Sequence, residues 1–312
     1  MAEIIRLSQL DSDYFSGMDM VAVIGFFDGL HKGHQKIIRL CVERAREIGG
    51  KSLVFTFDQP PVNVLKGTIT KKLITSFEEK LNLICHLGVD YIVTQSFNLE
   101  FSMLEPEYFC RHILMDKFHI KEIFVGEGFK FGKEGRGDGN YLRSFFKRYS
   151  IRVNIIPLYK ADGTVISSTN VRNFFKKGEI EKVNMLLGRK PCISGVVAKG
   201  KGRGKRLGFP TANIDVSDKF VTPRDGVYIG RVRVGQDPDL LPCLINVGDN
   251  PTFGDKKKWL EVFIVDFNKN IYGVKIKVCF LKKVRDEIRF ANSGELVRQI
   301  KKDLKEAKRF FG

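Results

Sequence analysis

The chain has 312 residues, of which 43% are hydrophobic and 29% charged, a composition typical of a globular protein with room for two cores. No apolar run reaches the roughly 18 residues of a membrane-spanning helix, and the N-terminus lacks the order of a signal peptide, which predicts a cytoplasmic protein without membrane association. The formal net charge is +17, and residues 189–312 hold 27 Lys and Arg against 14 Asp and Glu. This excess favours polyanionic ligands, from nucleotides to nucleic acid.

Six cysteines are scattered singly through apolar segments, and no two of them form a C-x-x-C pair. Zinc sites and disulfide frameworks usually show paired spacing, so the sequence favours neither. A lone cysteine in an apolar segment is typical of a small core residue. We therefore expect a core role without disulfides for Cys41, Cys85, Cys110, Cys192, Cys243 and Cys279.

Residues 1–188 alternate strand and helix signals and are predicted to form one domain. Strands joined by helices predict a parallel sheet of the Rossmann-like α/β class, which binds ligands beyond the carboxyl ends of its strands. The apolar runs lie at 21–24, 52–57, 89–94, 122–125 and 151–156, and helical periodicity lies near 34–48, 77–87, 105–118 and 140–148, with two short helices over 171–177 and 185–187.

Residues 189–312 have a different sequence pattern and are predicted to form a second domain. Short alternating strands with glycine- and proline-marked turns predict an antiparallel β-barrel. A closing amphipathic helix is expected over 293–311, with Ser293 as its cap. The strands are expected at 192–197, 227–234, 242–247, 259–267 and 274–281, with turns at 200–204, 223–226 and 268–270.

The segment Gly25–His34 follows the buried run Val21–Ile24 and carries glycines at positions 25, 29 and 33. Glycine permits positive φ and close backbone approach, and a helix expected from about His34 offers free N–H groups and a positive dipole end to an anion. His31 adds a second imidazole three residues earlier. The pattern predicts a phosphate site, the alternative being an ordinary strand–turn–helix connection with surface histidines.

This turn resembles a known signature. Its H-x-G-H is similar to that of the nucleotidylyltransferase superfamily, and the string G-x-F-D-G-x-H-x-G-H resembles the N-terminal module of prokaryotic bifunctional FAD synthetases. The resemblance implies that His31 and His34 are catalytic and stabilise charge at the α-phosphorus during adenylyl transfer. It implies an ATP phosphate site formed by Gly25, Phe27, Asp28, Gly29, His31, Gly33 and His34.

The segment Ile166–Arg172 resembles the second signature of that superfamily, I-S-x-x-x-x-R. The resemblance implies that hydroxyls and helix N–H groups meet phosphate here while Arg172 contacts pyrophosphate oxygens. A plain helix N-cap is the alternative for this Ser-Ser-Thr run. The residues added to the ATP site are Ser167, Ser168, Thr169 and Arg172.

Two further strings resemble the family but depart from its pattern. Residues 125–132 are similar to V-G-x-D-F-x-F-G, with Gly128 where Asp or Asn is usual, and residues 56–61 are similar to T-F-D-P-H-P, with Pro60 where His is usual. A hydrogen bond to a charged group contributes about 1.5–3 kcal/mol, so either loss would slow adenylyl transfer by about one or two powers of ten. The resemblance still implies a flavin side formed by Phe57, Asp58, Gly126 and Phe129.

The second domain begins with a glycine-rich basic segment, Gly200–Arg206, which alone is typical of a flexible surface loop. The proline, hydroxyl and amide that follow suit a hard Mg²⁺ shared with nucleotide phosphates. Residues 208–213 resemble the riboflavin kinase signature G-F-P-T-A-N. The resemblance implies that Thr211 and Asn213 hold Mg²⁺ and ATP, and that the ATP site also includes Gly200, Gly208 and Pro210.

Later segments at 226–228, 246–253, 260–267 and 284–290 also resemble the riboflavin kinase module. The resemblance implies that Glu261 is the base that accepts the proton of the ribityl hydroxyl, a role that general-base chemistry allows. A solvent-facing acid on an alternating strand is the alternative. Arg285 and Phe290 are implied as flavin-side residues, and Phe263 stands where His is common.

The motifs together predict a bifunctional riboflavin kinase and FMN adenylyltransferase that uses riboflavin, FMN, ATP and Mg²⁺ at two separate sites. One alternative is a riboflavin kinase with a weak or inactive adenylyltransferase module, motivated by Gly128 and Pro60. Another is an RNA-binding protein on an H-x-G-H fold, motivated by the basic second domain. The absence of RNA-stacking aromatic motifs argues against nucleic acid as a partner, and the oligomeric state stays open.

Overall fold

The computed structural model describes residues 2–200, 202–249 and 258–312. The chain divides into two compact units, Met1–Ser168 and Thr169–Gly312. Helices α7 (Ser168–Lys177) and α8 (Ile180–Leu187) therefore group with the second unit, whereas the sequence pattern places them at the end of the first domain. In the second unit, α8 packs on strand β16 (Lys275–Asp286), and the ring of Phe175 lies 5.6 Å from that of Phe280.

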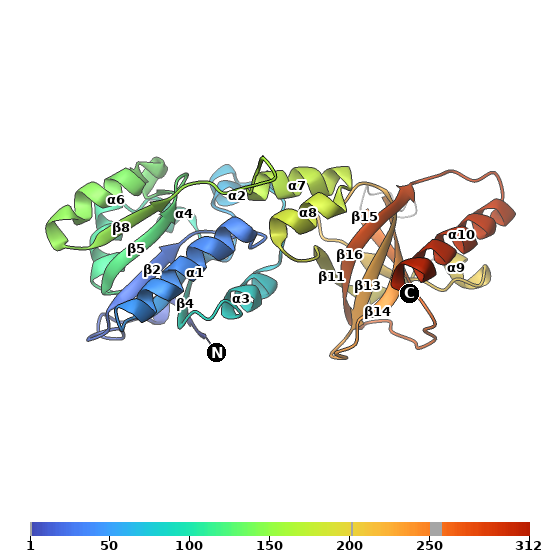
Figure 1. Ribbon diagram of the computed structural model, residues 1–312, viewed down its shortest axis with the longest axis horizontal. Coiled ribbons are helices and arrows are strands. Elements are labelled where there is room, and N and C mark those ends of the chain that lie inside the picture. The colour runs from blue at the N-terminus through green and yellow to red at the C-terminus, as the bar shows by residue number, and fades with distance from the viewer. Residues whose placement is uncertain (1, 201, 250–257) are drawn as a thin grey trace. The chain divides into compact units, whose positions relative to one another are not determined.

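A six-stranded sheet forms the centre of the first unit, and every strand pair in it is parallel, as predicted. The strand order is β1-β4-β3-β2-β5-β8 (Figure 1). The chain moves outward in one direction from β2 through β3 and in the other through β5, as in doubly wound folds. The strands are β1 (Glu3–Arg6), β2 (Met20–Ile24), β3 (Lys51–Phe57), β4 (Tyr91–Gln95), β5 (Ile120–Gly126) and β8 (Arg152–Ile156).

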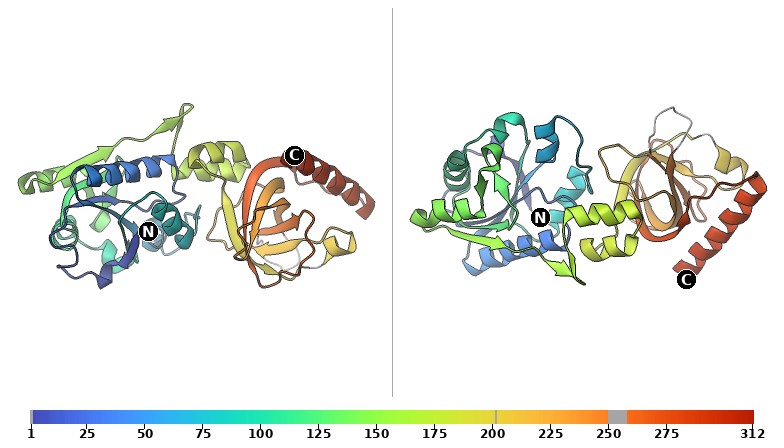
Figure 2. Two further views of the ribbon diagram at one scale, coloured as in Figure 1. Left: turned by 60° about the horizontal axis from the view of Figure 1, so that its bottom comes forward. Right: turned by 90° about the horizontal axis from the view of Figure 1, so that it is seen from above.

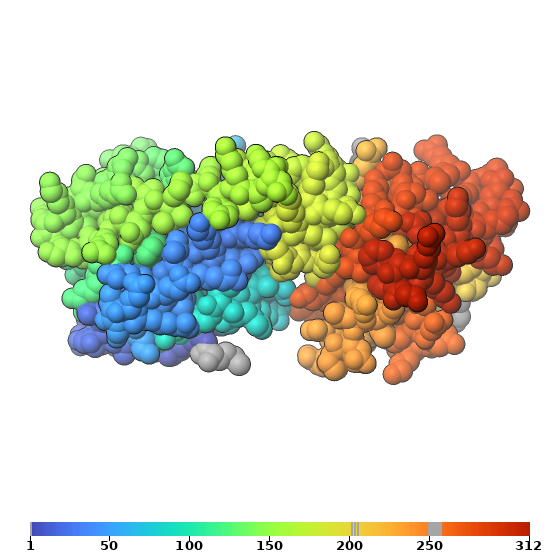
Figure 3. Space-filling view, viewed as in Figure 1, coloured from blue at the N-terminus to red at the C-terminus, as the bar shows by residue number. Residues whose placement is uncertain are grey.

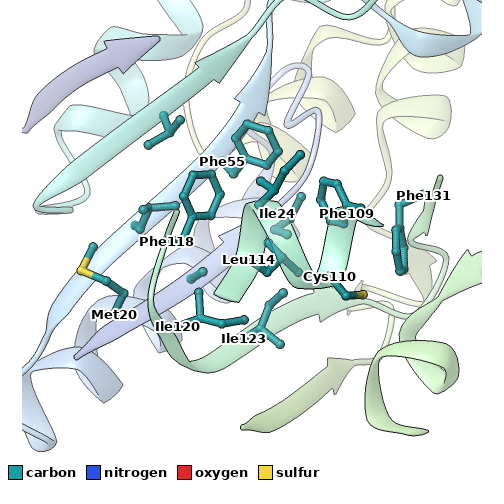
Figure 4. Close-up of a cluster of buried hydrophobic side chains, with 14 of the residues drawn as sticks. Met20, Ile24, Phe55, Phe109, Cys110, Leu114, Phe118, Ile120, Ile123 and Phe131 are labelled. Atoms are coloured by element: carbon teal, nitrogen blue, oxygen red, sulfur yellow. The ribbon is translucent and has the colours of Figure 1, made fainter. Parts of the chain in front are cut away.

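Successive residues of the central strand β2 face opposite sides of the sheet. Ala22 and Ile24 join a core cluster with the segment η2 (Phe109–Met115) and with helix α6 (Gly139–Phe146). Figure 4 shows Ile24 in this cluster. Val21 and Val23 join a second cluster beneath α1 (Lys32–Glu47) and α3 (Phe77–Cys85). Both faces of β2 are therefore buried, which explains its continuous apolar run.

Helices cover both faces of this sheet, and short elements complete the first unit. The α-helices are α1 (Lys32–Glu47), α2 (Pro61–Lys66), α3 (Phe77–Cys85), α4 (Leu99–Ser102), α5 (Pro106–Tyr108) and α6 (Gly139–Phe146); the π-helical and 3₁₀ segments are η1 (Leu7–Gln9), η2 (Phe109–Met115), η3 (Lys133–Gly135) and η4 (Lys147–Tyr149); the short strands are β6 (Lys130–Phe131), β7 (Gly137–Asp138), β9 (Lys160–Ala161) and β10 (Thr164–Val165).

The second unit contains a closed antiparallel barrel, also as predicted, with strand order β11-β12-β15-β14-β13-β16 (Figure 2). The short helix α9 (Arg203–Arg206) occupies part of the segment predicted as a glycine-rich turn. Strand β12 (Ala212–Asp215) begins in the last two residues of the G-F-P-T-A-N motif, where the sequence does not predict a strand. The remaining barrel strands are β11 (Cys192–Ala198), β12 (Ala212–Asp215), β13 (Gly226–Val234), β14 (Leu241–Asp249) and β15 (Lys258–Ile264).

The closing helix α10 (Ser293–Phe311) has the predicted bounds and lies on the outer surface of the barrel (Figure 3). Its Ala307 is fully buried and packs with Leu244 and Phe263 on the strands. The predicted cap Ser293 is wrong, because the side chain of Asn292 accepts the hydrogen bond from Glu295 N at 3.0 Å. Asparagine is among the best N-cap residues, since its carbonyl oxygen reaches these unpaired N–H groups.

The expectation that no cysteine forms a disulfide is wrong for one pair. Cys192 of β11 and Cys279 of β16 stand directly opposite each other in the ladder and are bonded. Only the strand register brings them together, since 87 positions separate them along the chain. The other four cysteines are free thiols, and Cys41, Cys110 and Cys243 are buried, as expected of core residues.

Thiol titration of the denatured protein should find four reactive groups before reduction and six after it, because the disulfide withholds two of the six cysteines. Reduction should also lower the free energy of unfolding of the barrel by about 2–4 kcal/mol, since the bond closes a long loop of the unfolded chain. Six reactive thiols in the untreated denatured protein would contradict the bond. A Cys192→Ser variant should show no stability change on reduction.

Candidate active sites

A cavity of about 330 Å³ lies beyond the carboxyl ends of β2, β5 and β8 in the first unit. Strand β2 is the point where the winding direction of the sheet reverses, and open α/β sheets bind their ligands at such points. The lining residues come from the turn after β2, the turn after β5, the segment after β8 and the start of α7. They include residues 24–27, 31, 33, 34 and 37, then 126–129, 156–159 and 166–168.

The turn after β2 has an unusual backbone. Phe27 and Leu30 have φ values of 55° and 37°, in the left-handed region that disfavours side chains. Gly29 between them has a φ of 78°, and its N–H donates to Thr75 Oγ1 at 3.2 Å. Gly25 cannot carry a side chain here, because a Cβ atom would lie 2.7 Å from the ring of Phe27. The glycines therefore shape the turn, as predicted from the sequence.

Asp28 is predicted from the sequence to belong to the ATP phosphate site, and in the structure its side chain is buried beside backbone N–H groups. Its side chain is 3% exposed and accepts hydrogen bonds from the backbone N–H groups of Ile74 and Thr75 at 3.0 and 3.3 Å. These bonds anchor the turn to the segment that precedes α3. The carboxylate of Asp28 therefore stabilises the conformation of the turn.

The two histidines lie together at the first turn of α1. His31 is the N-cap, and its Nδ1 accepts a hydrogen bond from His34 N at 3.2 Å. The helix begins at Lys32, two residues before the predicted start. The imidazole rings stack with centroids 3.6 Å apart, and the edge of Phe27 packs against His34 at 5.2 Å. Both histidines line the cavity at the positive end of a helix, where a negative charge is stabilised.

Serines from the second signature reach the same cavity. Ser167 and Ser168 line it, and Ser168 Oγ donates to the backbone carbonyl of Asp28 at 2.9 Å. Thr169 and Arg172 follow on α7, and Arg172 is buried, with 7% of its surface exposed. The serines therefore join the two signatures of the sequence within the first unit.

The predicted flavin-side residues divide into two groups. Gly126 and Phe129 line the cavity, as do Glu127 and Gly128. The side chain of Phe57 is buried in an aromatic cluster with Phe97, whose ring centroid lies 5.5 Å away. Asp58 accepts hydrogen bonds from Ser96 Oγ at 2.7 Å and from the N–H of Phe97 at 3.2 Å. Phe57 and Asp58 thus support the loop after β3.

In the barrel, strand register places three polar side chains in one row. Glu261 of β15 stands directly opposite Asn213 of β12 and Asn246 of β14. Its neighbours Leu260 and Val262 are fully buried and fill the barrel interior. Alternation along the strand places Glu261 on the outer face, the face on which Phe263 packs beneath α10. Asn246 belongs to the segment 246–253 that resembles the kinase module, of which residues 250–253 lie outside the described residues. It is not among the predicted site residues, because only the register shows that it neighbours Glu261.

The glycine-rich segment packs closely on the G-F-P-T-A-N motif. A Cβ atom at Gly200 would lie 2.5 Å from Asn213 Nδ2, and one at Gly204 would lie 3.4 Å from Thr211 Oγ1. Asn213 Nδ2 also donates to the carbonyl of Thr211 at 3.2 Å. Gly208 has a φ of 85° and turns the chain into the motif, ahead of Pro210. The backbone of this segment therefore approaches the two residues predicted to hold Mg²⁺.

The side chains of Thr211 and Asn213 carry oxygen atoms of the kind that bind a magnesium ion. Mg²⁺ prefers oxygen donors, keeps several waters and is usually shared with substrate phosphates, so one hydroxyl and one amide can suffice. Glu261 adds a carboxylate in the same row as Asn213. Among residues 2–200, 202–249 and 258–312, no group of three or more His, Cys, Asp or Glu could hold a metal ion by itself.

Arg285 and Phe290 lie near α10. The Arg285 guanidinium donates to both carboxylate oxygens of Asp303, with Nη2 2.8 Å from Oδ2, and Gln299 Nε2 donates to the same carboxylate at 2.8 Å. Asp303 is 3% exposed, and the guanidinium carbon lies 5.9 Å from the centroid of the Phe290 ring. A buried, bidentate pair of this kind fixes geometry. Arg285 therefore holds α10 against β16.

These two units define a class of protein in which an α/β unit with an H-x-G-H turn is joined to an antiparallel barrel with a glycine-rich segment. Matches to known families agree. The model of the FAD synthetase family matches residues 16–170, and that of the riboflavin kinase family matches residues 187–311.

Similar proteins cover the whole length. The bifunctional riboflavin kinase/FMN adenylyltransferase of Listeria monocytogenes is 33% identical over 97% of this chain and 96% of that protein. The protein of the same description from Bacillus subtilis is 34% identical over 93% of this chain and 92% of that protein. A crystal structure described as a macrolide-efflux protein from Streptococcus pneumoniae covers 98% of both chains at 29% identity, with a TM-score of 0.86.

The chain belongs to the bifunctional riboflavin kinase/FMN adenylyltransferase family. It is an enzyme with two activities, ATP-dependent phosphorylation of riboflavin to FMN and adenylylation of FMN to FAD with release of pyrophosphate. Matches to both modules do not favour the RNA-binding alternative or the alternative of a riboflavin kinase with a weak or inactive adenylyltransferase module. Within the described part of the chain, no helix combines the length and hydropathy needed to cross a membrane.

Proposed function

We propose that the cavity beyond β2 and β5 is the adenylyl-transfer site and that His31 and His34 act there on the ATP phosphates. The observation that carries this proposal is the position of the stacked imidazoles, which line the cavity at the first turn of α1. The N–H groups of α1 and the hydroxyls of Ser167 and Ser168 would hold phosphate oxygens. The phosphate of FMN attacks the α-phosphorus in line with the leaving pyrophosphate, so the site needs positioned donors rather than a covalent nucleophile.

We also propose that the kinase reaction takes place at the row of Asn213, Glu261 and Asn246. The carboxylate of Glu261 would accept the proton of the terminal ribityl hydroxyl, and the amide of Asn246 beside it would orient that hydroxyl. Thr211 and Asn213 would hold Mg²⁺, which when bound neutralises charge on the ATP phosphates. The register of the three strands supports this proposal, because Glu261 stands directly opposite Asn213 and Asn246.

The remaining assignments are proposals of the same kind. Riboflavin, FMN and ATP are the substrates, and a cytoplasmic location suits two reactions that consume ATP. Arg285 and Phe290 border the flavin of the kinase, with Arg285 acting through the position of α10. The hydroxyl of Thr169 contacts phosphate, and Arg172 contacts the oxygens of pyrophosphate. A functional boundary near residue 188 separates the two modules.

Gly128 offers a test of the flavin side of the first cavity. It lines the cavity, and nothing lies within 4 Å of a Cβ atom built on it, so a side chain fits without displacement. A Gly128→Asn variant should raise the rate of FAD formation from FMN by about tenfold, because the amide adds a hydrogen bond to a charged group. The measurement is kcat/KM for FMN.

The matched control is Gly128→Ala, which adds the Cβ atom without the amide and should leave the FAD rate within twofold of the wild type. FMN formation should be the same in all three proteins. An asparagine variant no faster than the alanine variant would contradict the proposed position of the flavin phosphate.

A further inference from the structure

Lys80 of α3 is a buried cation directly behind the phosphate-binding turn. Only 3% of the surface of Lys80 is exposed. Its Nζ donates to the backbone carbonyl of Phe26 at 2.9 Å and to that of Phe57 at 2.5 Å. Phe26 stands in the turn after β2, and Phe57 is the last residue of β3. One ammonium group thus ties the carboxyl ends of two neighbouring strands.

The carbonyl of Phe26 directly precedes the residue of the turn that has an unusual backbone conformation. The next residue, Phe27, has a φ of 55°, and such a conformation persists only where its surroundings hold it. Thr56 Oγ1 donates to the same carbonyl at 3.3 Å. Holding this oxygen fixes the peptide that leads into Phe27, whose ring in turn packs against His34. A chain of contacts therefore runs from Lys80 to the histidines.

The charge of Lys80 depends on pH within the neutral range. Burial lowers its pKa to about 7, and the carboxylates of Asp28 and Asp58 act in the opposite direction. The rings of Phe26 and Phe77 lie 4.3 and 5.3 Å from Nζ and favour the cation. The positive charge is therefore present below about pH 7 and is lost as the pH rises through this value.

We propose that Lys80 is a positioning residue for adenylyl transfer: its ammonium group holds the Phe26 carbonyl and so aims the Gly25–His34 turn at the ATP phosphates. Lys80 does not touch substrate in this account. Its charge lies behind the turn and adds to the positive potential at the start of α1. The inference rests on the proposed role of His31 and His34 in the same cavity.

The test compares Lys80→Met with Lys117→Met in the full-length protein. Lys117 is a matched control, since its Nζ also donates to a backbone carbonyl, that of Leu10, on a residue outside the cavity lining. At pH 6 we expect Lys80→Met to reduce kcat for FAD formation at least tenfold and Lys117→Met to leave it within twofold. Far-UV circular dichroism and thermal unfolding of the same samples check that the first unit is folded, and FMN formation, assigned to the second unit, should stay within twofold.

The pH profile separates positioning by a charged group from a role in packing. Effects of pH on the substrates are common to both proteins and cancel in the ratio of wild-type to Lys80→Met rates. This ratio should shrink at least threefold between pH 6 and pH 8.5, because the wild type loses the ammonium charge over that range. A ratio that stays constant with pH, or one below twofold at pH 6, overturns the proposal.

Lys80→Arg provides the second variant if Lys80→Met does not fold. Arginine keeps its charge at both pH values, so the FAD rate of this variant relative to wild type should rise between pH 6 and pH 8.5, whatever its absolute value. A falling or constant ratio overturns the proposal. A His31→Ala/His34→Ala variant that still makes FAD would refute the proposed site instead, so the two failures are distinguishable.

Discussion

Replacing both His31 and His34 by alanine is expected to reduce FAD formation about 10³-fold while FMN formation stays within twofold of the wild type. The two imidazoles line one cavity at the start of α1, and preorganised donors of this kind are each worth about 10²–10³ in rate when they meet charge in the transition state. The two losses are not expected to add fully, since the rings contact each other. The measurement is separation of FMN and FAD after incubation with ATP.

His112→Ala is the matched control, because its side chain is 47% exposed in a surface pair with Asp116. It should leave both rates unchanged. His31 also caps α1, so thermal unfolding and far-UV circular dichroism of the variant check that the first unit stays folded, because the kinase rate reports only on the second unit. FAD formation at the wild-type rate in the double variant would contradict the assignment.

Replacing Glu261 by alanine is expected to reduce FMN formation from riboflavin about 10³-fold, within the range of general-base effects. Binding of ATP should be retained, because the donors proposed for the phosphates and for Mg²⁺ are the glycine-rich segment, Thr211 and Asn213. Conversion of supplied FMN to FAD should be unchanged, since it takes place in the other unit. Quenched assays of each half-reaction measure these rates separately.

Glu306→Gln serves as the control for this experiment. Glu306 is a carboxylate of α10 that pairs with Lys282 at 3.4 Å on the outside of the same unit. Its replacement should leave FMN formation within twofold of the wild type. Turnover of Glu261→Ala at the wild-type rate would remove Glu261 from its role as base.

Much of the first unit follows from local patterns. The sequence predicts five strands of the parallel sheet within two residues of their observed ends. The central strand β2 is buried on both faces, which explains its continuous apolar run, whereas the edge strand β8 is only partly buried. Strand β1 is not predicted. It has four residues at the edge of the sheet, and only Ile5 among them is buried, which leaves too short a signal.

The features that the sequence does not predict depend on contacts between distant positions. Cys192 and Cys279 meet only through the register of β11 and β16, and Asn246 joins Glu261 only through that of β14 and β15. The H-x-G-H turn is the opposite case, because its residues are close along the chain and its motif already implies the cavity.

The burial of the charged side chain of Lys80 also depends on contacts between distant positions. A lysine on a helix usually extends its ammonium group into solvent, so the sequence does not predict that Lys80 is buried. Its position depends on how α3 packs beside the ends of β2 and β3, a tertiary contact that leaves two carbonyls to be satisfied by one ammonium group.

The most direct test of a single chain that makes FMN and then FAD is one incubation of the purified protein with riboflavin, ATP and Mg²⁺. Flavins separated by chromatography at successive times should show FMN rising first and FAD following, with pyrophosphate released in proportion to FAD. Accumulation of FMN without FAD would contradict the account, because it would mean that the cavity with Gly128 does not support adenylyl transfer.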